Sequence, residues 1–365
     1  MILSIRSLIF CFGLLTCYAC QGQQQPTTEQ DPATETLLGK EVTELPTQVW
    51  AIYQERSGHY WFGGNGEGVY FHDGSKLIEY TTADGLVDNQ IRGIQEDKFG
   101  NIYFDTPTGV SRFDGKSFTT LYPVTSPLNQ WKLERDDLWF SMNGNGNAVY
   151  RYDGTSLYLL TLPEYDLEKD LGIEYVKNPS FSPYGVYSIH QDKDGVMWFG
   201  TLMAGVYRYD GTDAMWIKEK ELSVLDDGRV PAVRSIIQDK DGYYWLSNSQ
   251  SRYRFYWVDM TGDEPGHWAY EKTEGMTAGP DHMEFPYFMS AVTDDNTGDL
   301  WMLTYSNGMW RYDGEQLFHY PITHEGKDVL LYTMYKDREG GIWLGSHNAG
   351  GFRFNGEEFE HFVLP

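Results

Sequence analysis

Residues 186–211 read VYSIHQDKDGVMWFGTLMAGVYRYDG, and this stretch decides the fold. It opens with an apolar strand, turns at 192–195 and returns through Trp198. A second apolar strand follows Gly205 and ends at the pair Asp-Gly, which is typical of tight hairpin turns. The stretch therefore predicts an antiparallel meander of short strands.

The same pattern recurs along the chain. Six copies place an acidic residue three positions after an apolar one, then a glycine and an aromatic residue at further steps of three. The aromatic residues are Trp61, Tyr103, Trp198, Trp245, Trp301 and Trp343, and a shortened copy contains Trp139. Their spacing of 36 to 59 residues suits one four-stranded propeller blade per copy.

These repeats predict an all-β fold, a seven-bladed β-propeller of four-stranded antiparallel blades over residues 45–365. A four-stranded sheet cannot bury both of its faces alone, and a ring of sheets leaves only short strand edges exposed. A superhelical stack of sheets is the alternative. The strand predicted at 358–362 favours closure into a ring, because it completes the last copy.

Charge and composition exclude several classes of protein. The chain has 53 Asp and Glu against 28 Lys and Arg, which gives a net charge of -25. Nucleic acids and anionic membrane faces bind positive surfaces, so neither is expected as a partner. Aromatic residues make up 16% of the chain and there are 39 glycines, which favours many short strands over long helices.

The amino terminus predicts export. All cysteines lie in the first twenty residues, so none is left in the folded body for a disulfide, a thiolate metal site or a nucleophile. Residues 1–19 resemble a bacterial lipoprotein signal with Cys20 as the lipidated residue, and an ordinary signal peptide is the alternative. Residues 20–44 are predicted to be a flexible tether. We therefore expect an extracytoplasmic protein, periplasmic or on the cell surface, whose lipid anchor alone holds it to an envelope membrane, with the outer membrane favoured.

The repeat also carries a family resemblance. The motif IHQDKDGVMW at 189–198, the segment GVYRYDG at 205–211 and the lead-in DGL at 84–86 resemble the two-component regulator propeller repeat. The resemblance covers about residues 45–365 and implies a sensor-type propeller, as in periplasmic domains of bacterial hybrid signalling proteins that often bind sugars or polysaccharide fragments. Their kinase and regulator parts are not in this sequence, so we expect a stand-alone, tethered propeller.

Candidate ligand-binding residues come from the start of each blade. The innermost strands should begin at the face that also receives the loops between second and third strands. One position before the apolar residue of each copy, small residues fit the crowded axis. Two positions before it, the row is varied, and it consists of Trp50, Arg92, Tyr187, Arg234, Ser290 and Tyr332. Paired arginines suit a carboxylate or sulfate, and aromatic rings suit a sugar face. In the alternative interpretation, the arginines pair with acidic groups inside the channel and the aromatic residues fill space between blades.

Loops add polar groups to the same predicted face. The candidates are Asn65, Asn145, Asn248, Tyr305, Asn307 and His347. Long connections near 161–184, 219–231 and 271–286 are expected there as well, and such insertions often mark a binding face. Their aromatic residues include Tyr165, Tyr175, Tyr184 and Phe285.

These features favour a non-catalytic recognition module that binds a glycan, a small metabolite or an envelope protein for a signalling or uptake system, without cofactor or metal. The alternatives are an envelope scaffold and a metal-assisted lyase or hydrolase. Streptogramin-cleaving lyases are the seven-bladed comparison for the enzyme, and only His282 and His347 fall in loops of the predicted face. No tight metal-ligand spacing supports that pair.

Overall fold

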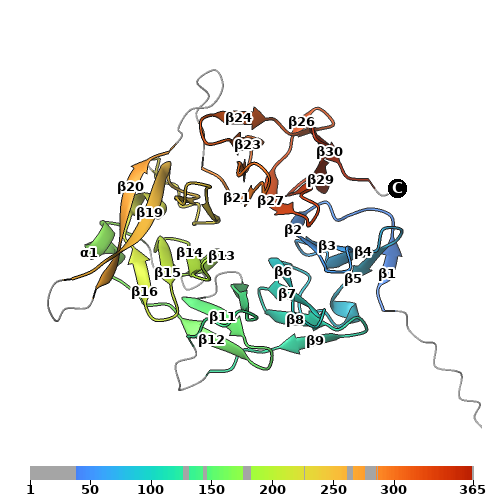
Figure 1. Ribbon diagram of the computed structural model, residues 1–365. Helices are drawn as coiled ribbons and strands as arrows, with labels where there is room; N and C mark the ends of the chain where they lie inside the picture. Colours follow the sequence, from blue (N-terminus) through green and yellow to red (C-terminus); the bar gives the residue numbers. More distant parts are fainter. Residues whose placement is uncertain are drawn as a thin grey trace, which may run out of the picture. The chain divides into compact units, whose positions relative to one another are not determined.

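Seven sheets of short antiparallel strands lie around a common axis in the computed structural model (Figure 1). The structure describes residues 38–125, 131–142, 146–175, 182–225, 227–260, 266–275, 285 and 287–363. The described part forms one folded unit from Leu38 onwards. The seven-bladed propeller is therefore confirmed, whereas the signal peptide, Cys20 and most of the tether lie outside the described residues.

Six of the seven blades contain the predicted four strands, ordered from the axis to the rim. Blade 1 contains β2 (Val49–Gln54), β3 (Tyr60–Gly64), β4 (Val69–His72) and β5 (Leu77–Tyr80). Blade 2 contains β6 (Gly93–Glu96), β7 (Ile102–Thr106), β8 (Gly109–Phe113) and β9 (Phe118–Leu121). Blade 4 contains β13 (Val186–Gln191), β14 (Met197–Thr201), β15 (Val206–Tyr209) and β16 (Ala214–Ile217).

The remaining four-stranded blades follow the same order. Blade 5 contains β17 (Ile236–Gln238), β18 (Tyr244–Leu246), β19 (Ser251–Val258) and β20 (His267–Glu274). Blade 6 contains β21 (Ser290–Thr293), β22 (Leu300–Leu303), β23 (Met309–Tyr312) and β24 (Leu317–Tyr320). Blade 7 contains β27 (Leu331–Lys336), β28 (Ile342–Ser346), β29 (Gly351–Phe354) and β30 (Phe359–His361), after the small hairpin β25 (Thr323–His324) and β26 (Lys327–Asp328).

A fifth strand extends blade 1 at the rim. Strand β1 (Lys40–Val42) pairs with β5, although its residues fall in the segment predicted as tether. The regular structure therefore begins before residue 45. The helical segments are short, η1 (Thr82–Asp84), α1 (Leu167–Leu171) and η3 (Lys220–Leu222). Across the described ranges, no helix has both the length and the apolar character needed to cross a membrane.

Blade 3 differs from the prediction of four strands. Its described strands are three, β10 (Leu138–Phe140), β11 (Ala148–Tyr152) and β12 (Leu157–Thr161). The chain after blade 2 runs along the rim instead, because Val124 bridges to Tyr158 of β12. At the axis, the Gln95 side chain of blade 2 donates directly to the carbonyl of Trp139 in β10, at 2.7 Å. Strand β10 thus takes the innermost position of blade 3.

In blades 4 and 7 the acidic residue of the repeat joins neighbouring blades. In blade 4 the Asp192 carboxylate accepts hydrogen bonds from Trp198 Nε1, at 2.9 Å, and from the Tyr244 hydroxyl of blade 5, at 2.6 Å. In blade 7 Asp337 accepts equivalent bonds from Trp343 and from Tyr60 of blade 1, both at 2.9 Å. This last pair closes the ring, which agrees with the expected closure and excludes an open stack.

The Asp-Gly hairpins divide the work of the turn between the two residues, and only the glycine adopts a positive φ. In the hairpin of blade 1 only Gly74 does so, at 95°. Asp73 precedes the turn, and its carboxylate accepts the backbone N–H groups of Ser75 and Lys76. The aspartate therefore acts as an acceptor for the turn, and glycine supplies the left-handed conformation.

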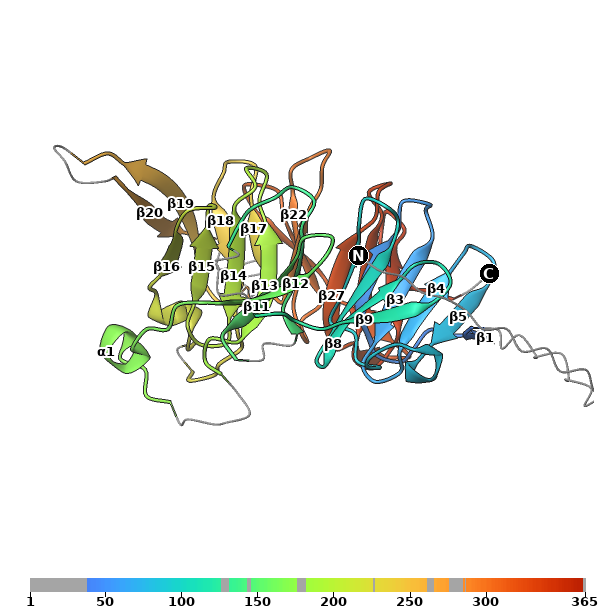
Figure 2. The ribbon, with the colours of Figure 1, turned by 90° about the horizontal axis from the view of Figure 1, so that it is seen from below.

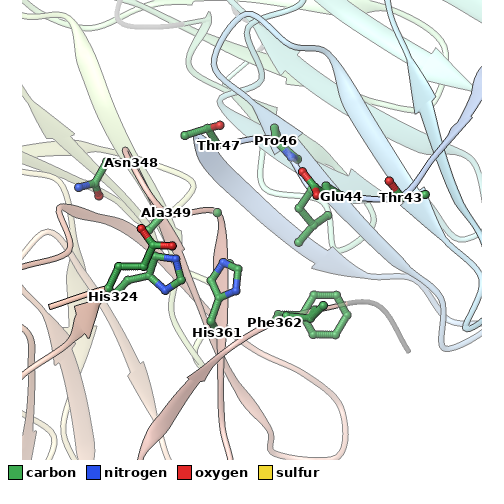
Figure 3. A pocket seen from close by; sticks show the side chains of 14 residues that line it. Thr43, Glu44, Pro46, Thr47, His324, Asn348, Ala349, His361 and Phe362 are labelled. Atoms are coloured by element: carbon green, nitrogen blue, oxygen red, sulfur yellow. The ribbon is translucent and has the colours of Figure 1, made fainter. Parts of the chain in front are cut away.

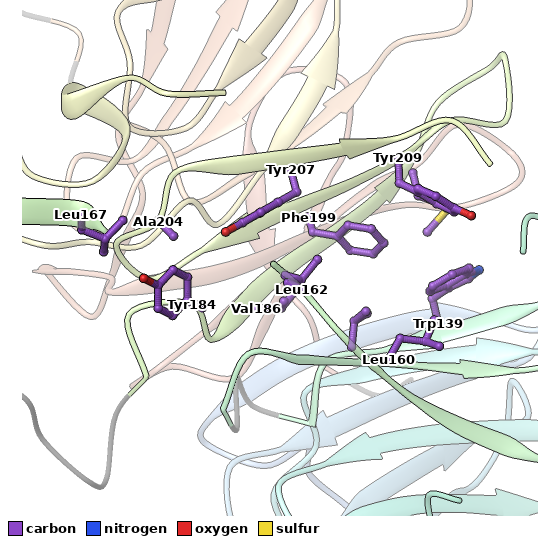
Figure 4. Packing of buried hydrophobic residues seen from close by; sticks show 12 residues of the cluster. Trp139, Leu160, Leu162, Leu167, Tyr184, Val186, Phe199, Ala204, Tyr207 and Tyr209 are labelled. Carbon is purple, nitrogen blue, oxygen red and sulfur yellow. The ribbon is translucent and has the colours of Figure 1, made fainter. Parts of the chain in front are cut away.

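Hydrophobic contacts between facing sheets hold the blades together. Between blades 3 and 4, Trp139 and Leu160 face Phe199 and Tyr209 (Figure 4). The connection from blade 3 to blade 4 contributes to the same cluster through residues such as Leu167 (Figure 4). Each interface between blades is thus a small core of its own, as expected when one sheet cannot bury both faces.

Blade 5 places its extra length elsewhere than predicted. The surplus between the fifth and sixth repeats was expected near 271–286, in the connection between blades. Part of it lies instead in the hairpin β19–β20, whose strands have eight residues each against four in blade 4. Figure 2 shows this hairpin extending on the side opposite to α1, which belongs to a connection between blades. The additional residues of β19 and β20 therefore extend from the face opposite the predicted binding face.

Candidate functional site

A cavity of about 460 Å³ lies where the innermost strands begin, and we call this end of the ring the channel mouth. Eight of the predicted ligand-binding residues line it, and they come from six blades. They are Trp50, Arg92, Tyr187, Arg234, Asn248, Tyr305, Tyr332 and His347. The structure thus brings together side chains that are almost 300 positions apart in sequence, although whether they bind a ligand stays a prediction.

Aromatic rings from blades 1, 6 and 7 form one side of the cavity. Trp50 and Tyr332 are stacked, with ring centroids 4.3 Å apart and an angle of 16° between planes. The His347 ring meets both edge-on at 4.9 Å, and it also contacts Tyr305 at 5.5 Å. Trp50 Nε1 donates to His347 Nδ1 at 3.2 Å. The cluster presents a stiff, largely apolar wall.

Arg92 extends this wall from blade 2. Its guanidinium carbon lies 4.2 Å from the centre of the Trp50 ring, as in a cation–π contact. One terminal nitrogen donates to Gln90 at 3.4 Å, and the buried Nε has no hydrogen-bond partner among the described residues. Its positive charge also acts on Asp105, whose carboxyl pKa burial nonetheless raises to about 6.

Asp105 is engaged elsewhere. Its carboxylate accepts the backbone N–H groups of Ser141 and Met142, at 2.9 and 3.0 Å, and the Ser141 hydroxyl at 3.1 Å. These bonds fasten blade 2 to blade 3. Asp105 therefore serves the contact between blades and makes no ion pair with Arg92 within 4 Å among the described residues.

Arg234 occupies the corresponding place in blade 5. Its guanidinium carbon lies 5.1 Å from the Tyr187 ring centre, and its Nε donates to the carbonyl of Pro231 at 3.0 Å. Burial, followed by the positive charges of Arg234 and Arg92, lowers the pKa of His347. Both arginines therefore act electrostatically on one imidazole at the channel mouth.

Three of the predicted ligand-binding residues are not among those that line the cavity. Asn65 turns its amide toward Gln48, to which its Nδ2 donates at 2.8 Å. Asn307 uses its backbone in the loop, where its carbonyl accepts from Trp310 Nε1 at 3.2 Å and lies 2.9 Å from His319 Nε2. Both residues therefore contact neighbouring segments of their own blade. Asn145 lies outside the described residues.

The strand register that the sequence predicts for blade 6 is wrong by one residue. In other blades the residue after the aromatic anchor pairs with the apolar residue of the repeat, as Phe199 does with Ile189. In blade 6 that partner is Ala291 and not Val292. The cavity residue of this blade is therefore Met289 and not Ser290.

A longer turn causes this shift. Gly298 N–H bonds to the carbonyl of Asp294, four positions back, whereas Gly195 N–H bonds to that of Asp192, three positions back. The extra residue separates Trp301 from the acidic residue of its turn. Within the part of the chain that the structure describes, the buried Trp301 Nε1 has no hydrogen-bond partner. The unpaired indole N–H of Trp301 thus accompanies the register shift of this blade.

The predicted insertions contribute less to the cavity than expected. Pro231 and Ala232 line it at the end of the 219–231 connection, together with Tyr287 and Phe288, which the sequence reasoning missed. The described aromatic residues of 161–184, together with Phe285, instead pack into cores, whereas Phe181 lies outside the described residues. The packed residues include Tyr165, Tyr175, Tyr184 and Phe285. Apolar rings on a long connection here stabilise the blades.

A second cavity, of about 400 Å³, was not predicted (Figure 3). It lies between the segment 43–47 before blade 1 and the hairpin and carboxy-terminal residues of blade 7. His324 and His361 stack there with ring centroids 4.3 Å apart, and burial followed by the charge of His324 lowers the pKa of His361. Most of the charged side chains around this cavity are exposed to solvent.

The alternative of a metal-assisted enzyme needs a cluster of ligands. Among the described residues, no group of three or more His, Cys, Asp or Glu side chains is placed to hold a metal ion. His347 is the histidine that lines the channel mouth, and its proposed partner His282 lies outside the described residues.

Comparison with known proteins supports the repeat assignment. Residues 180–202, which span the start of blade 4, match the two component regulator propeller family. Among curated proteins, no match to the sequence was found.

Several solved structures share the fold. The extracellular domain of the one component system BT4673 from B. thetaiotaomicron has a TM-score of 0.54 and 20% identity, covering 86% of this chain and 40% of that chain. Virginiamycin B lyase from Staphylococcus aureus has a TM-score of 0.54 and 14% identity, covering 84% and 95%. YCF48 from Cyanidioschyzon merolae has a TM-score of 0.54 and 12% identity, covering 87% and 99%.

The present chain spans about two fifths of the length of the BT4673 domain. At such identities the likeness concerns the fold, which sensors, a lyase and YCF48 share. The protein is a seven-bladed β-propeller that carries a two-component regulator propeller repeat at residues 180–202.

Proposed function

We propose that the protein is a non-catalytic recognition module that binds a small molecule or the end of a glycan at the channel mouth. The observation that carries this proposal is the convergence of eight side chains from six blades on one cavity. Its size falls within the range of about 300–1,000 Å³ that is usual for ligand sites. An aromatic wall with a few polar groups is also the usual lining of such sites.

The repeat adds support for a sensory role. The BT4673 domain, with the same fold, is the extracellular domain of a signalling system. By analogy, the channel mouth would detect a ligand outside the cytoplasm for a signalling or uptake system. This step is an analogy of fold, and the contacts in the cavity must carry the recognition.

Binding can be tested with a panel of oligosaccharides and metabolites titrated against the purified protein. Tyr305→Ala removes a solvent-exposed ring from the cavity wall, so the fold should persist while affinity falls about tenfold. Tyr256→Ala, on the β19–β20 hairpin, is the matched control and should bind as the wild type does. Equal affinity of the two variants for every ligand bound would contradict binding at the channel mouth.

We further propose that the protein is held to an envelope membrane by acyl chains on Cys20. The support is the lipoprotein-like signal in residues 1–19 and the polar segment that follows it. Cells that express the protein should incorporate labelled palmitate into it, and Cys20→Ala should abolish the label. Retention of label in Cys20→Ala and its loss in Cys17→Ala would move the anchor to Cys17.

An enzyme on the same platform is the second candidate. It is favoured by the position of His347 in the cavity and by the fold that the chain shares with virginiamycin B lyase. Turnover of any ligand that binds, lost in His347→Ala while binding persists, would establish it. Binding without turnover would favour the recognition module.

A further inference from the structure

The permanently charged side chains that line the channel mouth are all positive. Its lining includes two arginines and no aspartate or glutamate. This is unexpected in a chain with 53 acidic and 28 basic residues. A lining with two arginines and no carboxylate favours the binding of anions, because oppositely charged groups attract.

Neither arginine takes part in an ion pair within the described part of the chain, although the charge of Arg92 also acts on the buried carboxyl of Asp105. The ion pairs recorded there use other arginines, such as Arg208 with Asp210 and Arg353 with Asp337. Arg92 and Arg234 contact neutral groups, the Gln90 amide oxygen and the Pro231 carbonyl. Their positive charge is therefore available to a ligand.

The aromatic contacts leave N–H donors of both guanidinium groups usable. Arg92 lies over Trp50 and Arg234 over Tyr187, and a cation–π contact of this kind uses no N–H hydrogen bond of the guanidinium. The N–H donors lie in the plane, at the edges, where they match the paired oxygens of a carboxylate or sulfate. The aromatic contacts thus orient the groups without consuming their hydrogen bonds.

His347 adds a donor. An indole N–H can only donate, so the bond from Trp50 Nε1 requires an unprotonated Nδ1 on His347. The neutral ring then carries its proton on Nε2, which can donate but not accept. The lowering of the His347 pKa by burial and by both arginines agrees with this neutral form.

We infer that the ligand of the channel mouth is an organic anion, a molecule with a carboxylate or sulfate group beside a flat apolar face. The anionic group bonds to Arg92 and Arg234, and the apolar face lies against the wall of Trp50, Tyr332 and Tyr305. The inference rests on the proposed function, because it names the chemical class bound at the same site.

Matched pairs of probes test the inference in the purified protein by isothermal titration. One pair is trigalacturonate and its methyl ester, and the other is a sulfated galactose disaccharide and its desulfated form. At least one anion should bind about tenfold or more tightly than its neutral partner, since hydrogen bonds to charged groups are the stronger ones. Which pair shows the preference distinguishes carboxylate from sulfate.

Variants assign the effect to the arginines. Arg92→Ala and Arg234→Ala should each reduce anion affinity to near that of the neutral partner, and Arg234→Lys should restore only part of it because lysine lacks the fork. Arg254→Ala, at an exposed arginine over Tyr243 on β19, is the matched control and should change nothing.

Three outcomes would overturn the inference. Equal affinity for both members of each pair, lost in Tyr305→Ala, would reject the anion while leaving the proposed function intact. Anion binding that survives both arginine substitutions would place the anion elsewhere. Failure of all four probes and of inorganic sulfate to bind, when a neutral member of the broader panel does, would also reject it, whereas failure of the whole panel would reject the proposed function too.

Discussion

The arginines of the third strands and those of the channel mouth differ in what surrounds them. Each of four arginines in third strands lies within 4 Å of a carboxylate, and three of them also lie over the tryptophan of their own blade. The pairs are Arg208 with Asp210, Arg252 with Asp239, Arg311 with Asp299 and Arg353 with Asp337. Arg92 and Arg234 at the channel mouth have aromatic contacts but only neutral hydrogen-bond partners.

The difference separates arginines that form ion pairs within the blades from arginines that have no ion pair in the described part of the chain and that we propose as ligand contacts. Four of the arginines on third strands have a carboxylate within 4 Å, whereas Arg112 of blade 2 donates to the amide oxygen of Asn101 instead. An arginine outside the repeated pattern has no such partner built in. Departure from the repeated pattern is thus the feature on which the proposed ligand site rests.

The largest effect is expected when the carboxylate of a repeat is removed. Asp337→Ala leaves the buried donors of Trp343 and Tyr60 without an acceptor and breaks the contact between blades 7 and 1. We expect a loss of about 3–5 kcal/mol in the free energy of unfolding. Urea unfolding measures it, and Asp337→Asn, which keeps one acceptor, should cost less. A loss under about 1 kcal/mol would show that the ring closes without this bond.

The two classes of arginine should separate in a stability measurement. Arg208→Ala removes a buried ion pair with Asp210 and a stacking contact with Trp268 at 3.8 Å, so we expect a cost of about 2 kcal/mol. Arg234→Ala should change the unfolding free energy by no more than about 0.5 kcal/mol. Similar losses of unfolding free energy in both variants would contradict the distinction between arginines that stabilise the blades and arginines of the channel mouth.

The orphaned indole of blade 6 gives a smaller, paired prediction. Trp198→Phe removes a hydrogen bond to buried Asp192, whereas Trp301→Phe removes a donor without a partner. Both substitutions lose similar volume, so the first should cost about 1–2 kcal/mol more than the second. Equal melting shifts would mean that Trp301 Nε1 does find an acceptor.

The smallest effect concerns pH. The folded-state pKa of His347 is lowered below its ordinary value of 6.5, so the unfolded chain binds its proton first as pH falls. The stability contributed above pH 6.5 is therefore lost as the pH falls through the folded pKa. His190 and His361 shift in the same direction.

A difference measurement isolates His347 from the other histidines. The loss of stability between about pH 7.5 and 5.5, followed by urea unfolding, should be smaller in His347→Gln than in the wild type. Because the anion would offset the two arginines, adding a bound anion should also reduce the loss in the wild type. An unchanged pH dependence in His347→Gln would remove this histidine from the account.

Register shows why part of the site was predicted wrongly. Counting back from an apolar residue placed Trp50 and Tyr187 correctly, because their turns have equal length. The extra residue before Trp301 replaced Ser290 by Met289, and Val292 remained a plausible anchor by sequence alone. Strand pairing, which only coordinates reveal, decides between such neighbours.

The length of a connection predicted the lining of the cavity less well than the position of a residue along the repeat did. Tyr184 and Phe285 lie on long connections, yet both are buried in cores. A long apolar connection has two ways to avoid water, a ligand pocket or the interface between sheets, and its length does not distinguish them. The hairpin β19–β20 shows the same ambiguity, since it carried extra residues to the opposite face.

The sequence by itself determined the blade, the number of repeats and the row of residues near the axis, because short-range patterns of apolar, acidic and turn residues set each sheet. Tertiary structure alone decided which of those residues share a cavity and which charges find partners. Trp50 and His347 meet because the last blade packs against the first, a contact between distant segments that no local pattern encodes. The aromatic contacts of Arg92 and Arg234 likewise come from neighbouring blades, through Trp50 and Tyr187.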